Sequence, residues 1–149
     1  MSTLFINGSP NKNGNTALLA AALLKGKEYE TLNLTDYTIG AYGQNLPGDG
    51  LDAVINAMKQ ADTIVIGSPV YWHNSCGSVR NVLDRFYGKV ENGSLSGRRL
   101  YLVFQGAAPE KWMLEAGEYT MKRFAALYGM AYGGMATNKA EAVQLNKEV

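Results

Sequence analysis

Leu4-Phe5-Ile6-Asn7-Gly8-Ser9-Pro10-Asn11-Lys12-Asn13-Gly14-Asn15-Thr16 connects a short apolar run to a second apolar run, Ala17–Leu24. A β-branched and aromatic run that stops at Asn-Gly-Ser-Pro is typical of a strand, and Asn-Thr before an alanine and leucine block is typical of a helix start. The loop between them would direct backbone N–H groups and small hydroxyls to the positive end of a helix dipole. The stretch therefore predicts an anion-binding turn, although a plain strand-to-helix loop uses the same residue types.

The spacing within this turn excludes two known phosphate motifs. Five residues separate Gly8 from Gly14, and Asn15 stands where a Walker loop has its lysine. The dinucleotide fingerprint Gly-x-Gly-x-x-Gly is absent as well. Without the lysine, the turn suits one terminal monophosphate, held by N–H, Ser, Thr and Asn groups, better than a triphosphate with magnesium.

Composition predicts one ordinary globular domain, residues 1–149. The chain is 46% hydrophobic and 18% charged, and its net charge of +1 gives no reason to expect binding to nucleic acid or to a membrane surface. The single cysteine, Cys76, excludes an intramolecular disulfide, and no run resembles a signal peptide or a membrane span. We expect a cytoplasmic protein whose partners are small molecules or another copy of itself.

Hydrophobic periodicity predicts strands that alternate with helices along the whole chain. Strands are predicted at Thr3–Gly8, Tyr29–Asn33, Thr63–Ser68, Leu100–Phe104 and Met130–Met135. Helices are predicted at Thr16–Lys25, Leu51–Ala61, Val79–Phe86, Leu114–Tyr128 and Lys139–Val149. The segment Leu34–Gly50, which is rich in glycine and proline, is predicted to be a long loop.

This alternation predicts an α/β fold with a doubly wound five-stranded parallel sheet of strand order 2-1-3-4-5. A six-stranded dinucleotide fold would need more chain and its glycine fingerprint. In doubly wound sheets, ligands bind beyond the carboxyl ends of the strands where the strand order reverses. That rule selects three loops, residues 8–16, 68–76 and 105–109.

The second of these loops carries aromatic side chains that suit a flat ring. Tyr71 and Trp72 follow the proline-stiffened backbone at Pro69, although aromatics at such a place can also belong to the core or an interface. His73, the only histidine, can contact the ring or a substrate, and a shape or hydrogen-bonding role is favoured over proton transfer. For Cys76, packing as a small residue is favoured over a role as a redox thiol.

The residues Gly8–Thr16, Ser68–Trp72 and Val79–Phe86 together resemble the flavodoxin-like NAD(P)H-dependent FMN reductases, a family that includes iron–sulfur flavoproteins. The resemblance implies a flavodoxin-like fold and an FMN cofactor. It implies that the phosphate is bound by Ser9, Asn11, Asn15 and Thr16, and that the ring lies beside Pro69, Val70, Tyr71, Trp72, Gln105, Gly106 and Ala107. The segment Leu34–Gly50 lacks the cluster cysteines of iron–sulfur flavoproteins, so we expect a relative without a metal.

The resemblance implies an FMN-dependent oxidoreductase that takes hydride from NADH or NADPH and reduces a quinone, a flavin, a nitro compound or an azo compound. No residue is assigned as acid or base. Tyr71, Trp72 and His73 are expected to line the open face of the ring, with Tyr37, Tyr42 or Trp112 as further contributors from loops or a partner chain.

Two alternatives use the same turn. A flavodoxin-like electron carrier is usually strongly acidic, whereas this chain has 13 acidic and 14 basic side chains. A flavin-free phosphate-binding or nucleotide-binding regulator would not take up FMN. A homodimer or higher homo-oligomer is also expected, because a short closing helix would leave part of a sheet face uncovered.

Overall fold

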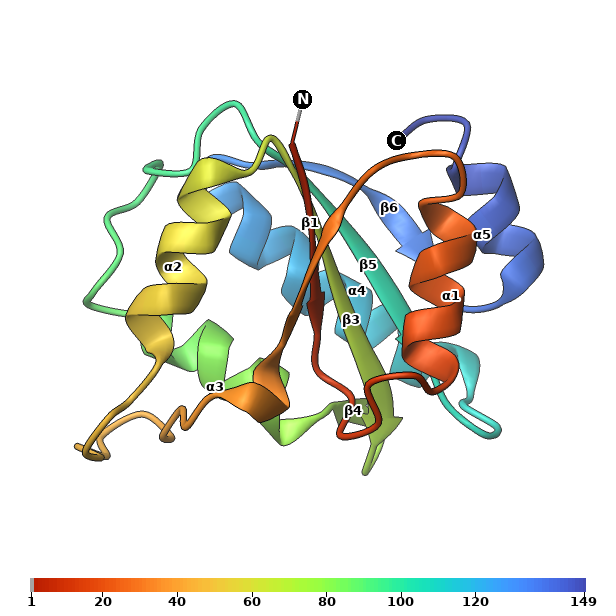
Figure 1. Ribbon diagram of the computed structural model, residues 1–149. Helices are drawn as coiled ribbons and strands as arrows, with labels where there is room; N and C mark the ends of the chain where they lie inside the picture. Colours follow the sequence, from red (N-terminus) through yellow and green to blue (C-terminus); the bar gives the residue numbers. More distant parts are fainter. Residues whose placement is uncertain (1) are drawn as a thin grey trace.

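The computed structural model describes residues 2–149 and consists of a parallel sheet with helices on both faces (Figure 1). The parallel strands are β1 (Thr3–Asn7), β2 (Glu30–Asn33), β3 (Thr63–Tyr71), β5 (Arg99–Gln105) and β6 (Ala131–Ala136). The helices are α1 (Asn15–Leu23), α2 (Leu51–Gln60), α3 (Gly77–Phe86), α4 (Lys111–Tyr128) and α5 (Lys139–Leu145). A single 3-10 turn, η1 (Leu34–Asp36), follows β2.

The order of the parallel strands is β2-β1-β3-β5-β6, which confirms the predicted doubly wound α/β fold and its order 2-1-3-4-5. The structure adds a sixth strand that the sequence did not predict. This strand, β4 (Asn74–Ser75), runs antiparallel to the end of β3, with Tyr71 opposite Asn74. Two residues are too few to show the alternation by which a strand is recognised in a sequence.

Both faces of the sheet are buried, and this explains why its central strands are continuously apolar. Phe5 and Val65 point into the core beneath α1 and α5, while Leu4 and Ile64 point into the core beneath α2, α3 and α4. Figure 1 shows α1 and α5 side by side on one face. Among residues 2–149, two helices therefore cover one face of the sheet and three cover the other.

Helix α4 approaches the sheet closely because Gly117 faces it. A Cβ atom at Gly117 would lie 2.2 Å from Cε2 of Phe104 in β5. The helix ends at Gly129, whose φ of 84° is left-handed and therefore favours glycine. Leu114 at the start of this helix is only half-buried, whereas its neighbour Met113 is buried.

The long segment between η1 and α2 is attached to α3 by an ion pair and by hydrogen bonds that Asn81 and Arg85 donate to the backbone carbonyls of Ile39 and Gly40. Arg85 Nη1 lies 2.7 Å from Oδ2 of Asp49, which also accepts the backbone N–H of Gly40 at 3.0 Å. The hydrogen bond from Arg85 holds the pKa of Asp49 well below its usual range. A segment that was predicted as a plain loop is thus fixed to the helix that follows β3.

Within residues 2–149, no helix combines the length and the apolar character that crossing a membrane requires.

Candidate functional site

The three predicted loops meet at the carboxyl edge of the sheet and are joined by hydrogen bonds. The backbone N–H of Gly8 donates to the carbonyl of Gly67 at 2.8 Å, and Ser78 Oγ donates to the carbonyl of Gly8 at 2.8 Å. Gln105 Nε2 donates to Thr16 Oγ1 at 3.2 Å. Residues that are far apart in sequence are therefore held as one site.

The first loop is folded by asparagine and serine side chains that accept hydrogen bonds from the backbone two residues further on. Asn7 Oδ1 accepts the N–H of Ser9, Ser9 Oγ accepts the N–H of Asn11, and Asn11 Oδ1 accepts the N–H of Asn13, each at 3.1 Å. Such turns are a property of Asn and Ser side chains. Asn7 was not predicted as a site residue. The sequence feature that could have identified it is a polar side chain at the end of a buried strand.

Two hydroxyl groups in this loop are positioned to donate to an anion. Ser9 is 7% exposed and Thr16 is fully buried. Each hydroxyl oxygen already accepts a hydrogen bond, from the N–H of Asn11 and from Gln105 Nε2 respectively. Among residues 2–149 neither hydroxyl has an acceptor for its own proton. This donor set fits a phosphate group.

The same loop leads to the N-terminus of α1, where a helix dipole favours negative charge. The N-cap is Gly14, which has no side chain to cap the helix. Thr16 lies close to β3 because residue 67 is glycine: a Cβ there would lie 2.8 Å from Thr16 Cγ2. Asn11 and Asn15 are exposed beside this helix end. All four residues that were predicted to bind phosphate are therefore placed around one turn.

The second loop is shorter than predicted, because β3 continues through Pro69 and Val70 to Tyr71. Pro69 is paired in register with Gln105 of β5, so the sheet extends to the edge of the site. Ser68 is fully buried and stabilises this extension: its Oγ donates to the carbonyl of Pro69 at 2.8 Å and accepts the N–H of Cys76 at 2.9 Å. A proline in the pattern had favoured an earlier end of the strand.

Trp72 and His73 form the turn between β3 and β4 in a left-handed backbone conformation. Their φ angles are 47° and 66°, values that residues other than glycine rarely adopt and that cost about 1 to 3 kcal/mol each. The turn leaves Trp72 96% exposed. The His73 ring contacts Trp112 of α4 edge to face, with ring centroids 5.6 Å apart. The strained turn thus leaves Trp72 in solvent and places the His73 ring against α4.

A cavity of about 220 Å³ lies between this turn and the third loop. It is lined by Val70, Trp72, His73, Gly106, Ala107, Ala108, Pro109 and Met113. The third loop can approach Val70 closely because residue 106 is glycine. A Cβ at this position would lie 3.1 Å from the Val70 Cβ. Small residues on one wall and aromatic residues on the other leave a space that suits a flat ring.

Two residues that were considered for this site have other surroundings. Cys76 is buried, and its Sγ lies 3.3 Å from the carbonyl oxygen of Gly8 and 3.3 Å from Ser78 Oγ. Tyr42 packs against Tyr87, with ring centroids 6.1 Å apart, and does not line this cavity. In the part of the chain that the structure describes, no group of His, Cys, Asp and Glu side chains could hold a metal ion.

A family model identifies the proteins to which this sequence is related. Residues 1–142 match the model of the NADPH-dependent FMN reductases. The chain belongs to this FMN reductase family. FMN is therefore the cofactor that the family brings to the site, and the donor set of the first loop together with the adjacent cavity fits its phosphate and its ring.

Individual relatives agree with this family. An iron–sulfur flavoprotein of Archaeoglobus fulgidus is 38% identical over 98 residues, which cover 57% of this chain and 48% of the relative. The chain spans about half the length of the curated relatives it matches, namely 48% and 51% of two iron–sulfur flavoproteins. With one cysteine in its sequence, this FMN reductase homologue cannot supply a cysteine cluster of its own.

Solved structures share the fold. The Trp repressor binding protein from Bacillus subtilis has a TM-score of 0.79 at 20% identity and covers 97% of this chain, which covers 98% of that protein. An FMN-dependent NADH-azoreductase from Bacillus anthracis, solved in complex with FMN, has a TM-score of 0.65 at 18% identity, with 99% and 95% of the two chains covered. These similarities concern the fold alone.

Proposed function

We propose that this chain is a single-domain, FMN-dependent oxidoreductase that takes hydride from NADH or NADPH and reduces a small acceptor such as a quinone, a flavin, a nitro compound or an azo compound. One observation supports the proposal above the others. Ser9 and Thr16 offer two nearly buried hydroxyl protons at an uncapped helix end, beside a cavity for a flat ring. When bound, FMN supplies two-electron redox chemistry between the nicotinamide and the acceptor.

The residues of the first loop would hold the phosphate. Ser9 and Thr16 would donate their hydroxyl protons, and Asn11 and Asn15 lie on the exposed side of the same turn. Gln105 would position Thr16, because its side-chain amide donates a hydrogen bond to the Thr16 hydroxyl oxygen and leaves the hydroxyl proton free to be donated. Binding would thus need no lysine, as the spacing of the turn indicates.

The second and third loops would hold the ring and exclude water from one face. Pro69, Val70 and Tyr71 continue the sheet to the edge of the cavity, and Gly106 and Ala107 form its opposite wall. Trp72 and His73 would line the side from which substrates approach. We assign these residues to positioning, since stacked rings at contact distance need no acid or base for hydride transfer.

A steady-state assay with the FMN-loaded protein tests this proposal. Oxidation of NADPH and NADH is followed by the loss of nicotinamide absorbance, with a benzoquinone, a nitroaromatic and an azo dye as acceptors. Turnover with at least one acceptor is expected. A protein that binds FMN but oxidises neither nicotinamide would instead be an electron carrier, and one that takes up no FMN would contradict the proposed site itself.

Self-association is the remaining part of the proposal. We infer that the protein works as a homodimer or higher homo-oligomer, because several large aromatic side chains on the α3 and α4 side of the molecule are exposed.

A further inference from the structure

The carbonyl group of Gly8, at the start of the first loop, is held by side chains of the second loop and of α3. Ser78 Oγ donates to this carbonyl oxygen at 2.8 Å, and Cys76 Sγ lies 3.3 Å from the same oxygen. Cys76 is in turn fixed to β3, because its backbone N–H donates to Ser68 Oγ at 2.9 Å. We refer to Ser68, Cys76 and Ser78 as the Gly8 anchor. The anchor connects the strand that borders the ring cavity with the loop that is proposed to hold the phosphate.

The peptide unit between Gly8 and Ser9 has both of its polar groups bonded within the protein. Its carbonyl oxygen accepts from Ser78, and its N–H, which belongs to Ser9, donates to Asn7 Oδ1 at 3.1 Å. These two hydrogen bonds fix the rotation of the peptide plane. Because α3 and α1 cover opposite faces of the sheet, the carbonyl oxygen is directed to the face opposite the proposed phosphate site.

Residue 8 has to be glycine because α3 comes close to it. A Cβ at Gly8 would lie 2.4 Å from Val79 Cγ2 and 2.9 Å from the carbonyl oxygen of Gly67. Glycine makes this approach possible, but its backbone is also the least restricted of all residues. The side chains of the Gly8 anchor therefore supply a restraint that residue 8 itself lacks.

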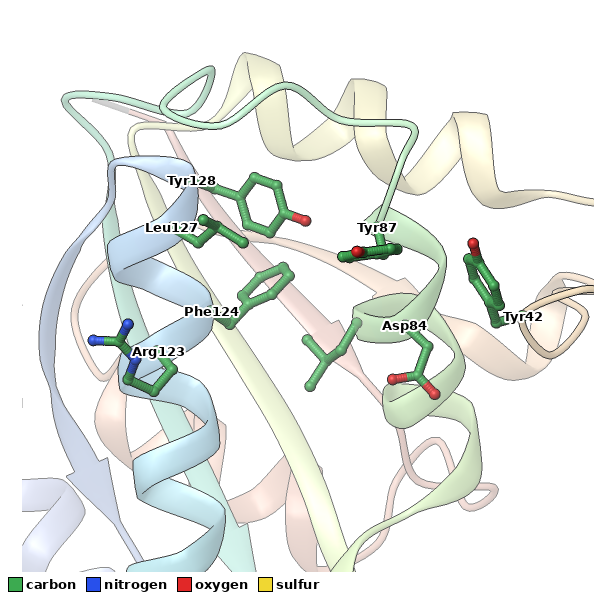
Figure 2. A pocket seen from close by; sticks show the side chains of 8 residues that line it. Tyr42, Asp84, Tyr87, Arg123, Phe124, Leu127 and Tyr128 are labelled. Atoms are coloured by element: carbon green, nitrogen blue, oxygen red, sulfur yellow. The ribbon is translucent and has the colours of Figure 1, made fainter.

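Helix α3 is a firm support for this restraint because it is packed from two sides. Phe86 is fully buried, and its ring centroid lies 5.1 Å from that of Phe124 and 5.2 Å from that of Tyr128 in α4. Figure 2 shows Phe124 and Tyr128 directed from α4 toward α3. On its other side, α3 holds the segment before α2 through Arg85 and Asp49, whose charged groups lie 2.7 Å apart. A hydroxyl on such a helix keeps its position and can determine where a glycine carbonyl points.

We propose that Ser78 is a positioning residue for the phosphate turn and acts through the carbonyl of Gly8, with the Cys76 thiol as a weaker second donor. A carbonyl oxygen that turned toward an anion would repel it, and the rotation would displace the hydroxyl of Ser9 on the next residue. Ser78 prevents this rotation, so the hydroxyl protons of Ser9 and Thr16 are the groups that a phosphate meets. The inference rests on the proposed function, because it concerns the phosphate of FMN.

Flavin affinity tests this inference with two ligands that differ only in the phosphate. FMN and riboflavin share the ring and the ribityl chain, so a residue that acts on the phosphate turn should change the affinity for FMN alone. In fluorescence titrations, Ser78→Ala should raise the Kd of FMN about tenfold and leave the Kd of riboflavin within about twofold of wild type. Ser78→Thr keeps the hydroxyl and should restore the affinity for FMN. Cys76→Ala removes a weak donor, so its effect on the Kd of FMN should stay below about threefold.

The FMN-loaded protein gives a second readout that does not depend on the affinity for riboflavin. With FMN at saturation, Ser78→Ala should move the phosphorus NMR resonance of the bound phosphate. The visible absorption bands of the flavin, which report on the ring, should stay as in wild type. Circular dichroism and Tm show whether each variant is folded.

Ser75→Ala is a matched control for Ser78→Ala. Ser75 is half-buried like Ser78 and lies three residues earlier in the chain. Within residues 2–149, however, the side chains that reach the Gly8 carbonyl are those of Ser78 and Cys76. The control should therefore leave the phosphorus resonance and both dissociation constants as in wild type.

Two outcomes would overturn the inference while the proposed function stands. One is a Kd of FMN and a phosphorus resonance in Ser78→Ala that equal those of wild type. The other is an equal loss of affinity for FMN and riboflavin, which would show that Ser78 only supports the fold. A wild-type protein that takes up no FMN would instead contradict the proposed function and remove the inference with it.

Discussion

Removing one hydroxyl group at the first loop tests the phosphate site most directly. Thr16→Val keeps the shape of the side chain, including the Cγ2 that packs near Gly67, and removes only Oγ1. A hydrogen bond to a charged group contributes about 1.5 to 3 kcal/mol. Since about 1.4 kcal/mol corresponds to a factor of ten, the Kd for FMN should rise by roughly 10-fold to 150-fold. The free energy of unfolding should fall by less than about 1 kcal/mol, because Gln105 is partly exposed and water can replace its lost partner.

The chain contains a matched control for this substitution. Thr63 is 2% exposed, and its Oγ1 accepts a hydrogen bond from Arg99 at 3.3 Å, but it begins β3 and therefore lies at the opposite edge of the sheet. Thr63→Val makes the same chemical change and should leave FMN affinity as in wild type. Titration of flavin fluorescence measures both variants. Equal Kd values for wild type and Thr16→Val would refute the assignment of this hydroxyl to the phosphate.

Two further predictions concern the segments around the site. Asp49→Asn should lower the free energy of unfolding by about 2 kcal/mol at pH 7, as measured by urea denaturation. The loss should shrink as the pH falls below about 4, because a carboxyl whose folded pKa is lowered stabilises the fold fully above its unfolded pKa and loses that contribution as the pH falls toward its folded pKa. Asp52→Asn, at an exposed pair with Lys89, should change stability by less than about 0.5 kcal/mol at either pH. Trp72→Asn combined with His73→Gly should raise Tm by about 3 °C, because Asn-Gly suits a left-handed two-residue turn. Reductase turnover should fall in that variant, since the substrate-side wall is lost, and an unchanged Tm would argue against strain in the turn.

The strands of the sheet were predictable because burial on both faces leaves a clear mark in a sequence. Runs such as Ile64–Ile66 are apolar at every position, and the helices between them repeat at i, i+3, i+4 and i+7. Errors occurred at the ends of elements, where local pattern and tertiary contact compete. Strand β3 continued past Pro69 because β5 lies beside it, and the predicted closing helix ended at Leu145 instead of Val149.

The site was predictable at the level of loops but not of contacts. Parallel strands bring their carboxyl ends to one edge, so the topology alone places the three loops together. The hydrogen bond from Gln105 to Thr16, the hydrogen bond from Asn7 Nδ2 to Asn33 Oδ1 and the contact of His73 with Trp112 join residues that are distant in sequence. No local pattern records such pairs.

By itself, the sequence of this protein determined the α/β class and the strand order, because these depend on periodicity and on residue types at short spacing, and it predicts that the first turn prefers a monophosphate. Only the tertiary structure showed that the hydroxyl protons of Ser9 and Thr16 have no acceptor among residues 2–149, that Trp72 and His73 lie in a strained turn, and that Trp112 lies near the cavity. Those facts depend on which groups of distant segments form hydrogen bonds and packing contacts with one another. That is a property of packing in three dimensions and not of order along the chain.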